Sequence, residues 1–268
     1  MIEIFKEQFS PRMTNEEKIH RVRELLQIMA LKIMYDKGSL DKLVFVGGTA
    51  LRVLYDLKRF SEDLDFSLYE KKGYDFKRMM DELAAGFKLY GLNADMKVND
   101  DKTVQAAFVK FEGLLKGLGL SPMGSQKLTI KVEVDTNPPE GAVFEKSMVN
   151  KTYFFYVPHP DLASLYAGKL SACFYRKYIK GRDFYDFIWF LARKIKPNYR
   201  LFNNAVQQTQ GTPPGVDETN IKDFLLENLA RVDLKQAARD VERFLEDRSE
   251  LKLFDKRLLE DSIVKVFG

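Results

Sequence analysis

Two aspartates two positions apart, Asp63 and Asp65, are the side chains best placed to do chemistry in this sequence. The surrounding residues predict a strand, in which alternate side chains project from the same sheet face. Both carboxylates are therefore expected on one face, with Leu64 and Phe66 on the other. Ser61 shares the parity of the aspartates and could extend that polar face.

Two carboxylates on one face repel each other, and a hard cation relieves that repulsion. Oxygen ligands of this kind suit Mg²⁺, or Mn²⁺ in its place, which typically binds through one or two carboxylates together with substrate phosphates. Such a metal ion, bridging the phosphates of an NTP and an acceptor oxygen, would stabilise an in-line displacement at phosphorus. The alternative is that Asp63 and Asp65 only form a solvated strand face.

A glycine pair stands upstream of the aspartates. The apolar run Leu43–Val46 predicts a short buried strand, and Gly47 and Gly48 end it. Without Cβ atoms the backbone can turn sharply there and approach a ligand closely. Thr49 is expected to open a helix, whose free N–H groups and dipole favour a phosphate. The glycines could also mark only a tight turn.

The whole block 46–68, VGGTALRVLYDLKRFSEDLDFSL, resembles the nucleotidyltransferase motif of the AbiEii/AbiGii toxin family. Members of that family carry G-G-[ST]-A followed by S-x-D-L-D-F, and the chain has Gly47–Ala50 and Ser61–Phe66 at these places. The resemblance spans roughly residues 40–190. It implies an α+β fold, with a DNA polymerase β-like nucleotidyltransferase core around a short mixed sheet and a helical C-terminal domain.

The resemblance also implies a third carboxylate on a neighbouring strand. In the sequence Lys131-Val132-Glu133-Val134-Asp135, alternation predicts the lysine and both acids on one face. Either Glu133 or Asp135 could be the third metal ligand or the base that takes the acceptor's proton. The lysine–apolar–acid order of the family favours Glu133. An ordinary amphipathic strand explains the same alternation.

A second block, residues 165–186, supplies cations. Lys169 and Arg176 are seven positions apart and so lie on one face of a predicted helix that ends near Gly181. A flexible ammonium suits a phosphate oxygen, so we assign Lys169 to the NTP triphosphate. A solvated lysine is the alternative.

The family resemblance implies the same role for that lysine, because members carry a lysine followed by R-D-x-x-D. Arg182, Asp183 and Asp186 match this group. Asp183 is then a candidate active-site carboxylate and Asp186 a weaker one. Arg182, like Arg176, could contact phosphate or hold those acids by bidentate pairing; a structural ion pair is the alternative for Arg182 and Asp186.

Composition narrows the chemistry further. The chain has 43 Lys and Arg against 39 Asp and Glu, a net charge of +4, which permits an RNA partner without demanding one. With a single cysteine, Cys173, it can form neither an intramolecular disulfide nor a cysteine-based zinc cluster. No stretch approaches the length of a membrane span, so we expect a cytoplasmic protein without membrane contacts.

Hydrophobic periodicity changes character at Pro158–Pro160. We therefore expect a nucleotidyltransferase core over residues 1–157 and a helical domain over 158–268, with the active site between them. In the core we predict helices over 15–37 and 74–90 and strands near 103–111 and 127–135. Beyond it we predict helices over 161–178, 183–194, 219–231, 233–247 and 255–266, and a flexible loop over 207–217.

The predicted reaction is transfer of NMP from an NTP to an acceptor, with release of pyrophosphate. The resemblance implies the toxin of a bacterial toxin–antitoxin or phage-defence system, with the 3′ end of tRNA as acceptor and a cognate antitoxin as a partner. Two alternatives stay open. The acceptor could be a protein or a small molecule, or the chain could be a non-catalytic module that binds NTP or RNA.

Overall fold

The computed structural model describes residues 1–268, which form two compact units. The first unit comprises Met1–Asp56, Phe60–Asn137 and Lys146–His159, and the second comprises Leu57–Arg59, Pro138–Glu145 and Pro160–Gly268. The chain thus passes to the second unit for three residues just before the aspartate pair, a detour that a single boundary near residue 158 does not anticipate.

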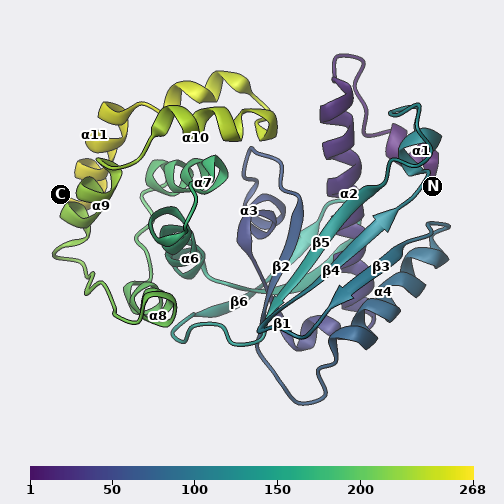
Figure 1. Ribbon diagram of the computed structural model, residues 1–268, viewed down its shortest axis with the longest axis horizontal. Helices are drawn as coiled ribbons and strands as arrows, with labels where there is room; N and C mark the ends of the chain where they lie inside the picture. Colours follow the sequence, from purple (N-terminus) through teal and green to yellow (C-terminus); the bar gives the residue numbers. More distant parts are fainter. The chain divides into compact units, whose positions relative to one another are not determined.

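The first unit is built on a five-stranded mixed sheet (Figure 1). The order of its strands is β1-β2-β5-β4-β3, with β2 and β5 parallel and the other neighbours antiparallel. The strands are β1 (Leu43–Val46), β2 (Asp63–Leu68), β3 (Asp95–Asn99), β4 (Val104–Phe111) and β5 (Leu128–Asp135). This arrangement confirms the α+β class predicted from the sequence.

Alternation of apolar and polar side chains sets the two faces of the central strands. In β2, Leu64 and Phe66 are buried, whereas the aspartates beside them are partly exposed. In β5, Val132 and Val134 are buried and the charged residues between them are partly exposed. The apolar face therefore anchors the sheet in the core and leaves the acidic face accessible.

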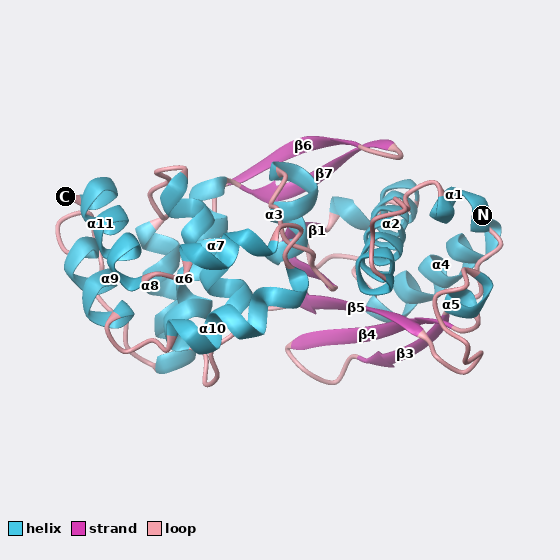
Figure 2. Cartoon of the chain, turned by 90° about the horizontal axis from the view of Figure 1, so that it is seen from above, coloured by secondary structure: helices cyan, strands magenta, loops and turns pink.

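Helices cover the apolar side of this sheet (Figure 2). The long helix α2 (Asn15–Asp36) confirms the helix predicted over 15–37 and begins at a capping box, in which Thr14 and Glu17 exchange side-chain and backbone hydrogen bonds. The other helices of this unit are α1 (Ile2–Lys6), α3 (Gly47–Tyr55), α4 (Phe76–Leu89) and α5 (Leu114–Gly117). A two-stranded hairpin of β6 (Phe144–Asn150) and β7 (Phe154–Pro160), which we did not predict, completes the strands.

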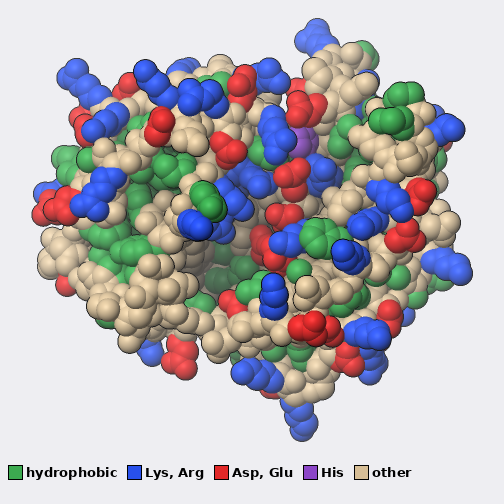
Figure 3. Space-filling view, viewed as in Figure 1, with side chains coloured by type: hydrophobic (Ala, Val, Ile, Leu, Met, Phe, Trp, Pro, Cys, Tyr) green, Lys and Arg blue, Asp and Glu red, His purple; other side chains and the backbone are tan.

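The second unit is helical, as predicted. Its helices are α6 (Leu162–Tyr175), α7 (Gly181–Ala192), α8 (Tyr199–Gln210), α9 (Ile221–Leu229), α10 (Leu234–Val241) and α11 (Lys256–Phe267), with 3₁₀ turns at Glu242–Phe244 and Arg248–Leu253. No helix of the chain combines the length and apolar character needed to cross a bilayer. On the face drawn in Figure 3, basic and acidic side chains are interspersed, and the basic ones do not form a single patch there.

Two predictions about this unit were wrong. Gly181 does not end a helix but begins α7, because its backbone packs against Ala237 so closely that a Cβ atom would overlap the Ala237 carbonyl, and its N–H donates to Asp240. Residues 207–210, predicted as loop, form the last turn of α8.

Candidate active site

The predicted carboxylates lie side by side on the central strands. In the parallel pairing of β2 with β5, Asp65 is opposite Glu133 and Asp63 is opposite Lys131. The Lys131 Nζ atom is 2.7 Å from Glu133 Oε1, so this lysine partly neutralises the row. Asp135 is two residues beyond Glu133 along β5 and lies opposite Ser67, further from Asp63. The register therefore brings Glu133, rather than Asp135, next to the aspartate pair.

No group of three or more His, Cys, Asp or Glu side chains is already gathered in the geometry of a metal site. Asp63 and Asp65 are partly exposed on one face, and Glu133 beside them is turned toward Lys131. Rotation of the Glu133 side chain away from Lys131 would be needed to complete a set of three carboxylates. These oxygen donors are of the kind that a hard cation such as Mg²⁺ takes.

Gly47 packs directly against Asp65. Val46 pairs with Asp65 across β1 and β2, and the next residue, Gly47, turns the chain with a φ angle of +79°. A Cβ atom on Gly47 would overlap Asp65 Oδ2. Glycine is therefore required at this position both by the backbone conformation and by the carboxylate that touches it.

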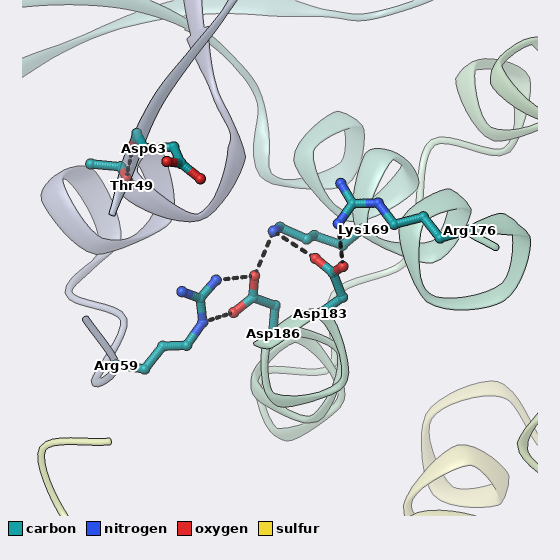
Figure 4. Close-up of polar contacts among 7 residues, drawn as sticks. All are labelled: Thr49, Arg59, Asp63, Lys169, Arg176, Asp183 and Asp186. Atoms are coloured by element: carbon teal, nitrogen blue, oxygen red, sulfur yellow. Dashed lines mark hydrogen bonds and ion pairs between the residues drawn. The ribbon is translucent and has the colours of Figure 1, made fainter. Parts of the chain in front are cut away.

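Thr49 connects helix α3, which begins with the two glycines, to strand β2, which carries Asp63 and Asp65. We expected Thr49 to open this helix, but α3 begins two residues earlier, at Gly47. Thr49 therefore lies within the first turn. Its side chain is buried, and its hydroxyl donates a hydrogen bond to the backbone carbonyl of Asp63 (Figure 4). The hydroxyl thus stabilises the packing of α3 against β2. The first N–H groups of any helix have no partner within the helix, so those of α3 are candidate donors to a phosphate.

Ser61 stands just before β2 and is partly exposed. Its backbone carbonyl accepts a hydrogen bond of 3.2 Å from the side-chain amide of Gln27, a fully buried residue of α2. This contact fixes the entry to the aspartate strand. The role of Gln27 was missed, because a glutamine on an otherwise apolar helix face gives no signal of its partner 34 positions away.

The cations of the second block form a separate network within the second unit (Figure 4). Lys169 Nζ is 3.2 Å from Asp183 Oδ1 and 2.7 Å from Asp186 Oδ2, and its side chain is only 12 % exposed. Burial alone would lower the pKa of Lys169, but the two carboxylates outweigh it and raise that pKa above its usual value. The lysine is therefore held fully charged.

Two arginines complete this network. Arg59 donates from Nε and Nη2 to the two carboxylate oxygens of Asp186, and Arg176 Nη1 is 2.7 Å from Asp183 Oδ2. Burial acts to raise the pKa of Asp183, but Lys169 and Arg176 outweigh it and lower the pKa. Asp183 is thus kept ionised although its side chain is buried.

The contacts of Arg176 and Arg182 differ from those predicted from the sequence. Arg176 is not on the face of α6 but follows its end in an extended conformation, from which it reaches Asp183. Arg182 stacks over the ring of Phe244, 4.4 Å from its centroid, whereas the bidentate pairing expected of an arginine is made by Arg59. Arg59 was not among the predicted residues, although it lies inside the motif block two positions before Ser61.

Cys173 belongs to the core of the second unit. It is buried, and burial raises the pKa of its thiol well above the usual value. The thiol is therefore neutral near pH 7 and acts as a small core side chain rather than as a nucleophile. The aspartate row and the lysine network belong to different units. Their joint action in one active site stays a prediction.

Comparisons with known proteins identify the family. No protein of curated function matches the chain. Among solved structures, a proposed nucleotidyltransferase from Helicobacter pylori is 17 % identical, with a TM-score of 0.52 over 97 % of this chain and 100 % of that one. The H. pylori protein JHP933 is 19 % identical, with a TM-score of 0.46 over 92 % and 96 % of the two chains. The family described as "Nucleotidyl transferase AbiEii toxin, Type IV TA system" matches residues 30–258.

The first of these likenesses agrees with the fold described above. The family match covers most of the chain and includes both the Gly-Gly-Thr-Ala and Ser-Glu-Asp-Leu-Asp-Phe motifs and the lysine network. The chain therefore belongs to the AbiEii family of nucleotidyl transferase toxins, which are components of type IV toxin–antitoxin systems.

Proposed function

We propose that this protein transfers a nucleoside monophosphate from an NTP to the 3′ end of tRNA, releasing pyrophosphate. The observation that carries the proposal is the row of Asp63 and Asp65 on one face of β2, with Glu133 opposite Asp65 and the first turn of α3 beside it. The acceptor is taken from the family resemblance, since fold alone does not define a substrate.

In this mechanism Asp63, Asp65 and Glu133 hold a divalent cation, Mg²⁺ or Mn²⁺. Bound there, the cation would neutralise charge that develops on the phosphates as they are displaced. The fit rests on three carboxylates that neighbour one another on the same face of β2 and β5, and on Lys131, which offsets the charge of Glu133. A chelator should therefore stop transfer, and added Mg²⁺ should restore it.

The chain's own groups position the reactants. Gly47 and Gly48 allow the backbone N–H groups of the first turn of α3 to approach a phosphate. Lys169 binds the triphosphate as a preformed ammonium held by Asp183 and Asp186. A bond forms between the acceptor oxygen and the α-phosphorus as the bond to pyrophosphate breaks, and a carboxylate of the β2–β5 row takes the hydroxyl proton.

The proposal is tested by incubating the purified protein and total tRNA with NTPs labelled either at the α- or at the γ-phosphate, and then separating RNA from protein. We expect label in RNA from the α-position only, because the β- and γ-phosphates leave as pyrophosphate. Label in the protein fraction would favour the rival acceptor. Binding of NTP with no transfer to any acceptor would favour the non-catalytic module.

A further inference from the structure

The hairpin of β6 and β7 has one buried face and one bare face. Along β7, Phe155, Val157 and His159 are buried, whereas the side chains of Phe154 and Tyr156 between them are 68 % and 53 % exposed. Successive side chains of a strand point to opposite faces, so the two exposed rings stand next but one on the outer face. These two aromatic side chains are exposed to solvent, so they do not contribute to the core of the unit.

The facing strand adds to this outer surface. His159 Nε2 lies 2.8 Å from Ser147 Oγ, which places Ser147 on the inner face with His159. By alternation Lys146 and Met148 then lie on the outer face, and Met148 is 52 % exposed. We call Lys146, Met148, Phe154 and Tyr156, together with Lys151 in the connecting turn, the outer hairpin face.

The charged side chains of the outer hairpin face are both positive. Lys146 and Lys151 are exposed, and neither makes an ion pair with an acidic side chain. Other lysines of the same unit do so: Lys127, for example, lies 2.6 Å from Glu112. Glu145 has the parity of Ser147 and so belongs to the opposite face. The outer hairpin face thus combines exposed rings with uncompensated positive charge.

The inner face fixes this hairpin to the helix that begins at the aspartate row. Tyr55, the last residue of α3, has its hydroxyl 3.4 Å from His159 Nδ1, and the two rings meet edge to face. Phe155 also contacts Tyr35 of α2. Helix α3 begins at Gly47, which touches Asp65, and is roughly 13 Å long at 1.5 Å per residue. Figure 2 shows the hairpin beside α3.

We propose that the outer hairpin face is a stacking platform for unpaired bases of the acceptor RNA, a proposal that rests on the proposed function. Phe154 and Tyr156 would each stack on a base, and Lys146 and Lys151 would contact the neighbouring phosphates. Aromatic rings interleaved with cations are the usual means of binding single strands with little sequence preference. The two lysines favour RNA over a protein partner, because lysine is depleted at interfaces between proteins whereas it binds the phosphates of a nucleic acid.

The test measures binding of a fluorescein-labelled 12-nucleotide oligouridylate to the full-length protein by anisotropy, without NTP and with a chelator. Phe154→Leu/Tyr156→Leu keeps apolar area but removes the rings, and we expect affinity to fall about tenfold or more. Phe154→Trp should bind at least as well as the unaltered protein. Lys146→Gln/Lys151→Gln should weaken binding and reduce its salt dependence. Leu89→Ala removes an apolar side chain that is even more exposed, on α4, and as the control it should change nothing.

The proposal is overturned if the double leucine variant binds the oligonucleotide as tightly as the unaltered protein. It is equally overturned if that variant retains binding while losing a protein partner in pull-down, which would assign the face to protein docking. Asp63→Asn should bind the oligonucleotide normally. A protein that binds RNA through these rings but transfers no nucleotide would refute the proposed function and leave the platform intact.

Discussion

Arg59 donates hydrogen bonds of 2.7 Å and 2.6 Å to the two carboxylate oxygens of Asp186, and both side chains are almost completely inaccessible to solvent. The backbone of Arg59 also forms an antiparallel bridge with Leu245. These contacts hold the three residues Leu57–Arg59 in the second unit, immediately before the chain enters the aspartate strand. The ion pair therefore anchors one end of the segment that carries Asp63 and Asp65.

Replacing Arg59 with methionine should destabilise the protein strongly. The substitution leaves the Asp186 carboxylate buried with Lys169 as its remaining cation, and the loss of one partner of a buried pair typically costs about 3–5 kcal/mol. Urea unfolding measures the change. Arg78→Ala, which breaks an exposed pair with Glu82 on α4, is the control and should cost at most about 1 kcal/mol. Equal losses for the two variants would show that Arg59 is not an anchor.

Gly47→Ala should impair catalysis as well as stability. Both Gly47 and Gly91 have positive φ angles, of +79° and +73°, but a Cβ atom on Gly91 would meet nothing within 4 Å. Gly91→Ala therefore reports the backbone strain alone, about 1–2 kcal/mol. Gly47→Ala also displaces the Asp65 carboxylate, and we expect transfer to fall roughly 100-fold. If the two variants transfer equally well, the contact between Gly47 and Asp65 is irrelevant to the reaction.

The Lys169 network predicts a particular pH dependence of stability. The folded pKa of Asp183 is lowered from its ordinary 3.8, so its contribution is complete above that value and is lost as the pH falls through the lowered pKa. The folded pKa of Lys169 is raised from 10.5, so its contribution is complete below pH 10.5 and is lost above it. Between these limits the contribution of the network should be constant.

Unfolding of Asp183→Asn in urea over a range of pH tests this. The difference in unfolding free energy between the variant and the unaltered protein should be constant near neutral pH and shrink below about pH 4, as Asp183 itself becomes protonated. A difference that persists undiminished into strong acid would mean that the charge of Asp183 does not stabilise the fold.

Sequence patterns were most informative where local physics dominates. The run Leu43–Val46 coincides with β1, and the capping box at Thr14 coincides with the start of α2. The alternation in Lys131–Asp135 correctly placed the acids on the accessible face of β5. In each case the signal lies within a few residues and depends only on periodicity or on a capping side chain.

Long-range contacts account for what the sequence did not predict. Arg59 and Asp186 are 127 positions apart, and neither has a local signal for the other. Gly181 resembles a helix stop, yet it begins α7 because α10 packs against it. The preference for Glu133 over Asp135 beside Asp65 follows from the register of β2 with β5, which alternation alone leaves undetermined.

The central claim is that Asp63 and Asp65 carry out nucleotide transfer, and transfer of α-labelled NTP to tRNA by their asparagine variants tests it most directly. Asparagine keeps the shape of each side chain but removes the charge. We expect Asp63→Asn and Asp65→Asn each to fold normally and to transfer at least about 1000-fold more slowly, because a metal ligand is lost. Asp81→Asn, at an exposed position of α4, should transfer at the unaltered rate. Full transfer by a folded Asp63→Asn variant would contradict the central claim.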